Sequence, residues 1–129
     1  MRPRPEPAVV GWLDRQPPES VWTTSITVFE IWSGLETMES GYRRRTLISG
    51  FERILTELID GRVTVFDTES ARCAAALLAE GQKRGRAVEM RDVMIAGIVV
   101  ARRARLATRN ERHFGAIRAS VVNPWTDQG

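Results

Sequence analysis

The amino-acid sequence predicts a single α/β domain in which helices cover both faces of a mostly parallel sheet. Short β-branched runs alternate with helical patterns along the chain, as they do in proteins with parallel sheets. The 129 residues suit one domain, residues 1–129, and contain no repeat, linker or low-complexity tract. A hydrophobic share of 43% and a charged share of 27% are ordinary values. These features are typical of a soluble globular protein.

Proline and glycine set the limits of the elements in the first half of the chain. Pro17 and Pro18 end a first helix, and Gly41 separates two later ones. Thr27 and Glu30 have the spacing of a capping box, with threonine at the N-cap and glutamate three residues on. The expected elements are a helix at 6–15, a strand at 21–24, a helix from 25 or 27 to 37, a helix at 42–59 and a strand at 62–66. The apolar stripe of the helix at 42–59 consists of Leu47, Phe51, Ile54, Leu55 and Leu58.

The second half of the chain continues the alternation of helices and strands. One of the residues 67–70 is expected to cap a helix that ends at Glu80. Gly81 and Gly85 flank the polar loop that follows. The remaining expected elements are a helix from about residue 88, a strand at 106–108 and a last strand at 119–122.

Nothing in the sequence indicates a membrane or an exported protein. The longest apolar run, residues 93–101, has nine residues, whereas a membrane span needs about 20. The residues before Pro5 contain no apolar signal segment, and the single cysteine, Cys73, excludes an internal disulfide. We therefore expect a cytoplasmic protein.

Arginine accounts for eighteen of the nineteen basic residues, although the net charge is only +3. The planar guanidinium suits phosphate recognition, which mildly favours a nucleic-acid partner. A GC-rich genome, in which arginine codons are common, is an equally good explanation.

Asp92 stands at the head of a face that is otherwise apolar. In the helix expected from about residue 88, Ile95, Ala96 and Val99 share a face with Asp92, because they follow it by three, four and seven residues. A carboxylate beside a buried stripe is costly unless something cationic meets it. Asp92 is therefore a candidate functional residue.

Glu30 repeats this arrangement, since Thr27, Ile31, Gly34 and Leu35 lie on its face of a helix. Both acids are expected near the carboxyl ends of strands, where ligands gather in parallel sheets. Two neighbouring carboxylates repel each other unless a divalent cation lies between them. Oxygen ligands with open positions suit Mg²⁺ or Mn²⁺, and such a site can hydrolyse phosphodiesters.

Each of these residues also has a purely structural explanation. Glu30 can be only the capping-box partner of Thr27. Asp92 can be placed to favour the dipole at a helix N-terminus. Asn110 is by default a turn residue, and His113 has no second histidine, serine or cysteine at a useful spacing.

Four short motifs stand in order along the chain. They are S-I-T-V-x-E-I-x-x-G-L at 25–35, R-D-V-M-I-A at 91–96, L-A-T-R-N at 106–110 and V-V-N-P-W at 121–125. In this order and spacing they resemble PIN-domain toxins, most closely the VapC and FitB-like group of bacterial toxin–antitoxin pairs. The resemblance covers essentially the whole chain.

The resemblance implies a PIN-like three-layer α/β/α sandwich and Mg²⁺- or Mn²⁺-dependent endoribonuclease activity. It also implies a homodimer that a cognate antitoxin silences. In the family pattern Glu30 and Asp92 match two metal-binding acids, and Asn110 stands where many members carry a third aspartate. Thr108 and Arg109 would lie near the phosphate of the RNA.

One feature departs from the family pattern. Family members begin with a buried strand that ends in D-T-N, about a dozen residues before an R-P-x-P segment. This sequence begins at Met1-Arg2-Pro3-Arg4-Pro5, after that point. We therefore expect either an upstream start or an N-terminally truncated copy. A truncated copy leaves a second function open: a catalytically impaired PIN-fold module that binds antitoxin or RNA without cleaving.

Overall fold

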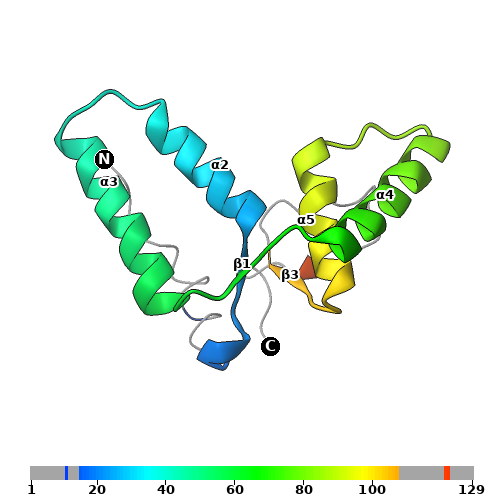
Figure 1. Cartoon of the computed structure of the whole chain (residues 1–129), viewed down its shortest axis with the longest axis horizontal. Coiled ribbons are helices and arrows are strands. Elements are labelled where there is room, and N and C mark those ends of the chain that lie inside the picture. Colours follow the sequence, from blue (N-terminus) through cyan, green and yellow to red (C-terminus); the bar gives the residue numbers. More distant parts are fainter. Residues whose placement is uncertain (1–10, 12–14, 108–120, 123–129) are drawn as a thin grey trace. The chain divides into compact units, whose positions relative to one another are not determined.

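The structure, a computed structural model, describes Gly11, residues 15–107 and residues 121–122 (Figure 1). Two compact units divide this part of the chain. The first unit is Pro17–Val65, and residues 66–107 and Val121–Val122 belong to the second unit. The helix expected at 6–15 lies almost entirely outside the described residues.

In the first unit two short strands pair in parallel. A single 3-10 turn, η1 (Pro18–Ser20), precedes β1 (Thr23–Thr24), which pairs with β2 (Val63–Thr64) so that Thr23 lies opposite Val63. Arg62 reinforces this pairing. Its Nε donates to the carbonyl oxygen of Val21 at 2.9 Å and its Nη2 donates to that of Leu58 at 3.1 Å. The chain therefore enters its first long helix from a fixed strand end.

Helices α2 (Ser25–Glu36) and α3 (Tyr42–Arg53) follow β1. Their apolar contact centres on Trp32 and Phe51, whose rings meet edge to face with centroids 5.5 Å apart. Leu35 and Phe51 are the buried side chains of these two helices. Between helices with so few buried side chains, the aromatic pair is a large part of the packing.

The long helix expected at 42–59 is interrupted. After Arg53 the chain forms one π-helical turn, η2 (Ile54–Leu58), and the N–H of Ile59 donates to the carbonyl oxygen of Ile54 at 2.8 Å. This wider turn changes the phase of the side chains relative to an α-helix. Ile54 and Leu58, expected in the apolar stripe, are accordingly 48% and 53% exposed.

The second unit is built on α4 (Thr68–Lys83) and α5 (Met90–Ala101), which contact each other more extensively than any other pair of described elements. The two helices are in close contact at Gly97. A Cβ atom on Gly97 would lie 2.5 Å from the carbonyl oxygen of Ser70 and 2.7 Å from the Cβ of Ala74. Only glycine fits at this position without moving one helix away from the other.

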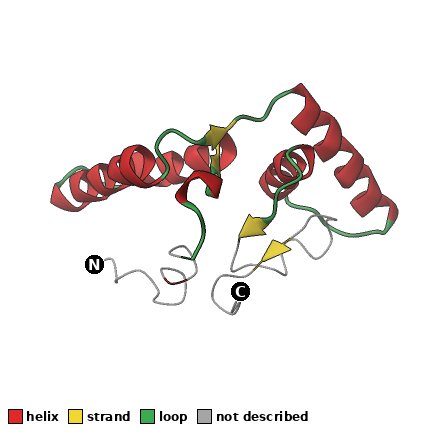
Figure 2. Ribbon diagram, turned by 90° about the horizontal axis from the view of Figure 1, so that it is seen from below, coloured by secondary structure: helices red, strands yellow, loops and turns green. Residues whose placement is uncertain are grey.

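A second parallel pair, β3 (Leu106–Ala107) and β4 (Val121–Val122), also belongs to this unit (Figure 2). Leu106 of β3 packs against the buried pair Val93 and Ala96 of α5. Leu77, Leu78 and Val88 surround the same two residues. The strand that leads to Thr108 is thus anchored on α5, the helix that carries Asp92.

Helix α4 does not end at Glu80, as the glycine spacing had predicted, but continues to Lys83. Gly81 is a buried helical residue, and it is Gly85, with φ +68°, that ends the helix. The N–H of Gly85 donates to Gln82 and that of Arg86 donates to Gly81, both at 3.0 Å. This is the Schellman arrangement, which needs its left-handed glycine after the last helical turn.

The α/β class and the parallel strands are confirmed. The strands expected at 21–24 and 62–66 are shorter than predicted, Thr23–Thr24 and Val63–Thr64. The strands expected at 106–108 and 119–122 extend beyond the described residues, which include Leu106–Ala107 and Val121–Val122. The described strands form two separate parallel pairs. Of the helices in the described part, none is long and apolar enough to cross a membrane.

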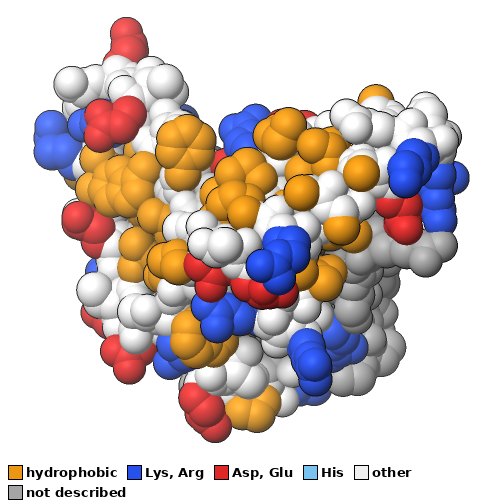
Figure 3. Space-filling model, turned by 45° about the vertical axis from the view of Figure 1, so that its right-hand side comes forward, with side chains coloured by type: hydrophobic (Ala, Val, Ile, Leu, Met, Phe, Trp, Pro, Cys, Tyr) orange, Lys and Arg blue, Asp and Glu red, His pale blue; other side chains and the backbone are white. Residues whose placement is uncertain are grey.

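Hydrophobic side chains reach the surface at several places (Figure 3). In the first unit the exposed large ones are Trp22, Phe29, Ile31, Tyr42, Ile54, Leu58 and Val65. In the second unit they are Met90 and Val100. Among the described residues, exposed large hydrophobic side chains are therefore more numerous in the first unit than in the second.

Candidate functional site

Asp92 occupies the third position of α5, in its first turn, and its side chain is half-buried. The residue that caps this helix is Glu89, whose Oε1 accepts a hydrogen bond from the N–H of Asp92 at 3.1 Å. Arg91 lies close to the other oxygen, with Nε 3.5 Å from Oε2 of Glu89. The carboxylate of Asp92 is therefore not needed as the helix cap, because Glu89 fills that position.

The apolar face below Asp92 is as the sequence predicts. Ile95, Ala96 and Val99 are exposed by 7%, 0% and 6%, so the carboxylate does head a buried stripe. A carboxylate near a helix N-terminus is favoured by the helix dipole, and this structural explanation of Asp92 remains. The dipole does not explain why the acid lies over the buried side of the helix.

Glu30 lies in the second turn of α2 and is half-buried. The predicted capping box at Thr27 is wrong, because Thr24 is the N-cap. The Thr24 hydroxyl oxygen accepts from the N–H of Thr27 at 3.0 Å, and the two hydroxyl groups are 2.9 Å apart. The helix begins three residues earlier than the box requires. Glu30 is therefore not the capping-box partner of Thr27 that the sequence suggested.

The other predicted site residues, Thr108, Arg109 and Asn110, lie outside the described residues, as does His113. Their roles stay predictions. Ala107, the residue before Thr108, is described and pairs with Val122 in the β3–β4 ladder. The register of β3 thus fixes where the chain enters the predicted phosphate-binding segment.

Glu30 belongs to the first unit and Asp92 to the second, so a cation shared by these two carboxylates stays a prediction. Within the described part of the chain, no three histidine, cysteine, aspartate or glutamate side chains cluster as a metal site. Mg²⁺ commonly uses only one or two carboxylates and completes its octahedral shell with water and phosphate oxygens. Two hard carboxylates therefore suit Mg²⁺ or Mn²⁺ better than zinc, for which four protein ligands or histidines are usual.

Two charged residues next to these elements cap helices, and sequence reasoning missed only the first of them. Glu89 caps α5, and its signal was an acid three residues before Asp92. Asp67 caps α4 by accepting from the N–H of Ser70 at 2.9 Å, and its other oxygen lies 3.5 Å from Nη2 of Arg102. The hydrogen bond from Ser70, together with the nearby Arg102 charge, lowers the pKa of Asp67. Its position among residues 67–70 was predicted, but not its partner.

Comparison with known proteins places these elements in a family. A family model described as the PIN domain matches residues 1–119. The chain is 36% identical to the plasmid stability protein StbB of Pseudomonas syringae pv. tomato, over 96% of this chain and 89% of that protein. It is 34% identical to a VapC ribonuclease of Sinorhizobium fredii, over 94% and 86% of the two chains.

Toxin FitB of Neisseria gonorrhoeae is 31% identical, over 98% of this chain and 91% of that protein. Among solved structures, a chain of the FitAB complex bound to a DNA fragment superposes with a TM-score of 0.87 and 30% identity. That match covers 99% of this chain and 90% of the FitAB chain.

Proposed function

This chain belongs to the PIN-domain family, with VapC and FitB toxins among its relatives, and we propose that it is a metal-dependent endoribonuclease toxin of a toxin–antitoxin pair. Its reaction would be hydrolysis of RNA phosphodiester bonds. The observation that carries the proposal is the half-buried carboxylate of Asp92 over the apolar face of α5, in a chain 34% identical to a VapC ribonuclease.

In this proposal Glu30 and Asp92 hold Mg²⁺ or Mn²⁺, and Asn110 assists them. The bound cation would lower the pKa of a water molecule and stabilise negative charge on the phosphate. Two carboxylates, rather than three, leave more of the metal's coordination sites for water and phosphate. The amide of Asn110 adds an oxygen donor without adding a third negative charge near the phosphate.

Thr108 and Arg109 would bind the phosphate on the substrate side. The guanidinium of Arg109 can donate two parallel hydrogen bonds to phosphate oxygens, and the hydroxyl of Thr108 can donate one. Both residues follow β3, whose Leu106 is packed on α5. A substrate-binding segment that starts from a packed strand loses less conformational entropy on binding than one on a free loop.

The proposal extends to partners. The solved relative described above is FitAB bound to a DNA fragment. This similarity supports a cognate antitoxin as the protein partner of this chain. We also propose a homodimer, a cytoplasmic location and a single domain. The family model spans residues of both units, which supports the single domain.

The proposal is tested by cleavage of a labelled single-stranded RNA with MgCl₂, with MnCl₂ and with EDTA. We expect cleavage by the full chain with either metal and none with EDTA. Glu30→Gln and Asp92→Asn should each lower the rate by about 100-fold or more, because each removes a charged ligand. Glu52→Gln is the matched control, since Glu52 is exposed on α3 and its side chain makes no hydrogen bond or ion pair within the described chain. This control should cut RNA like the parent.

A second measurement separates metal binding from activity. Calorimetric titration with MnCl₂ should show weaker binding in Glu30→Gln and Asp92→Asn than in the parent and Glu52→Gln. If both site variants cut RNA as fast as the parent, the metal-site assignment is wrong. If the parent binds RNA and Mn²⁺ but never cleaves, the chain is the non-cleaving binding module instead.

A further inference from the structure

Three exposed cations follow one another where α4 ends: Lys83, Arg84 and Arg86. We call them the basic turn. The Schellman hydrogen bonds of Gly85 and Arg86 fix the backbone of this turn, so its two arginines stand on either side of a left-handed glycine. The cations are therefore presented from a defined backbone and not from a loosely held loop.

The charges of the basic turn are not neutralised within the described chain. Three arginines of the second unit have acidic partners: Arg72 pairs with Glu69, Arg91 with Glu89 and Arg102 with Asp67. Arg103 and Arg105, like the basic turn, make no ion pair among the described residues. The three cations of the basic turn are exposed, and among the described residues they make no ion pair. Uncompensated, neighbouring positive charges repel each other and favour an anionic ligand.

The basic turn and Asp92 lie at the same end of the helix pair. Residues 84–89 connect the last turn of α4 to the first turn of α5, and Figure 1 shows this connection along one end of the two helices. Asp92 is in that first turn. A polyanion that extends from Asp92 along this connection would therefore reach the basic turn within the same unit.

A helix-dipole explanation covers only part of the basic turn. Lys83 and Arg84 end α4, where cations are favoured by roughly 0.3–1 kcal/mol each. Arg86 lies beyond Gly85, outside the helix, and gains less from the dipole. The opposite end of the same helix pair offers a comparison, because Arg103 and Arg105 follow the end of α5 and are equally exposed.

We propose that the basic turn binds phosphates of the RNA strand that flank the bond to be cleaved. The inference rests on the proposed function, because it assumes that RNA is held at Asp92. It assigns to Lys83, Arg84 and Arg86 a part of substrate binding that is independent of base sequence. Phosphate contacts of this kind position a nucleic acid and make its affinity depend on salt.

The test is binding of a fluorescein-labelled, mixed-sequence single-stranded RNA 20-mer by fluorescence anisotropy, in EDTA to prevent cleavage. Kd is measured for the full chain from 50 to 300 mM KCl. We expect Arg84→Gln/Arg86→Gln to weaken binding by about three- to tenfold at low salt. The slope of log Kd against log[KCl] should fall by about 0.7 for each lost phosphate contact.

Two matched variants distinguish the effect of the position of the cations from the effect of total charge. Arg103→Gln/Arg105→Gln removes the same charge from the other end of the helix pair and should keep the parent's Kd and slope. Arg84→Lys/Arg86→Lys keeps the charge and should retain most of the slope. Equal losses in the two glutamine variants, or no RNA binding by the parent, would overturn the inference.

The outcome also distinguishes this inference from the proposed function. If the parent cleaves RNA with Mg²⁺ while Arg84→Gln/Arg86→Gln binds as tightly as the parent, the basic turn is not a binding element and the ribonuclease assignment stands. If binding depends on the basic turn but no metal supports cleavage, the phosphate contact stands and the ribonuclease assignment fails.

Discussion

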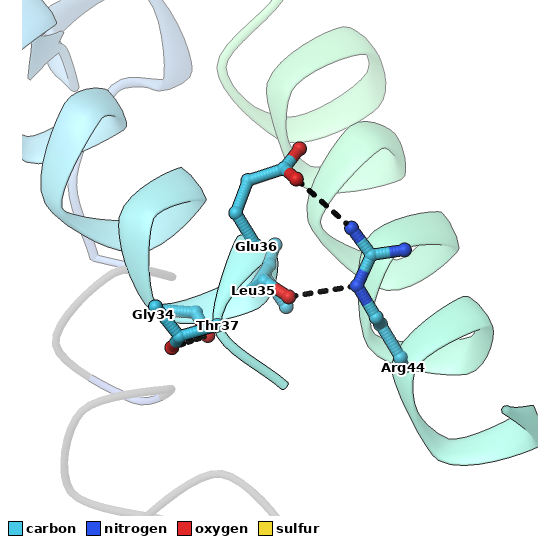
Figure 4. Close-up of polar contacts among 5 residues, drawn as sticks. All are labelled: Gly34, Leu35, Glu36, Thr37 and Arg44. Atoms are coloured by element: carbon cyan, nitrogen blue, oxygen red, sulfur yellow. Dashed lines mark hydrogen bonds and ion pairs between the residues drawn. The ribbon is translucent and has the colours of Figure 1, made fainter. Parts of the chain in front are cut away.

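The two helix pairs of this protein are held together in different ways. In the second unit α4 and α5 meet through small residues, and the backbone of one helix touches the other at Gly97. In the first unit α2 and α3 are held by one aromatic pair and by Arg44, a polar link between them. Arg44 Nε donates to the carbonyl oxygen of Leu35 at 2.8 Å and its Nη2 reaches Glu36 at 3.2 Å (Figure 4).

This difference bears on the two acids of the proposed site. Asp92 stands on a helix whose residues 95–99 are all buried, so its backbone is fixed by close packing. Glu30 stands on a helix with one buried side chain, Leu35, and its position depends on fewer contacts. Of the two proposed metal ligands, Asp92 is thus the one on the more closely packed helix, and the position of Glu30 should be more easily changed by substitution.

The largest effect is expected from one glycine-to-alanine substitution made in each helix pair. Gly97→Ala forces a methyl group against the backbone of α4, which costs about 3 kcal/mol, while better helix propensity returns about 1 kcal/mol. We expect a net loss of about 2 kcal/mol in the free energy of unfolding. The same substitution at Gly50 of α3, where a Cβ meets nothing within 4 Å, should stabilise by about 0.5–1 kcal/mol.

Both values can be measured by urea unfolding followed by circular dichroism at 222 nm. Opposite signs at the two glycines would support the contrast between the helix pairs. A Gly97→Ala protein as stable as the parent would show that α4 and α5 separate without cost, and the close packing would then not be what fixes Asp92.

A smaller effect is expected at the polar link of the first unit. Arg44→Ala removes two charge-assisted hydrogen bonds near the C-terminus of α2 and should cost about 1 kcal/mol. Arg45→Ala is the matched control, because Arg45 is exposed and its side chain makes no hydrogen bond or ion pair in the described chain. Thermal unfolding of the two variants should show a lower Tm for Arg44→Ala alone. Equal Tm values would mean that the aromatic pair by itself holds the two helices.

Periodicity and turn chemistry predicted most of the fold because they depend on neighbouring residues. The predicted buried face beneath Asp92 is confirmed, because the helical repeat of its apolar residues allows only one face to be buried. The start of α4 was predicted to lie among residues 67–70, and Asp67 is its cap. Family membership followed from four motifs, none of which is specific alone.

The start of α2 and the end of α4 could not be predicted, because at each of them two neighbouring residues carry nearly the same local signal. Thr24 and Thr27 can each cap α2, and the pairing of β1 with β2 favours the earlier one. Gly81 and Gly85 can each end α4, but Gly81 is buried within the helix, and Gly85, with its positive φ, ends it. The π turn after Arg53 has no sequence signal that we recognise. Neither the capping box nor the helix end could be decided without the tertiary contacts.

The smallest effect is expected at the cap of α4, and it should depend on pH. The hydrogen bond from the N–H of Ser70, with a smaller contribution from the charge of Arg102, lowers the pKa of Asp67 in the folded state. A carboxyl group with a lowered folded-state pKa stabilises the fold above its unfolded value, about 3.9, and this contribution is lost as the pH falls through the folded-state pKa. Asp67→Asn keeps an acceptor for Ser70 but removes the charge, so its Tm at pH 7 should lie slightly below that of the parent. The two proteins should converge in Tm between about pH 5 and pH 2, as Asp67 of the parent is protonated. Arg102→Gln removes only the nearby positive charge, which lowers the pKa of Asp67 by less than the Ser70 hydrogen bond does. It should therefore lower Tm at pH 7 by less than Asp67→Asn. A difference between parent and Asp67→Asn that stays constant from pH 7 to pH 2 would show that the charge of Asp67 is not what stabilises the start of α4.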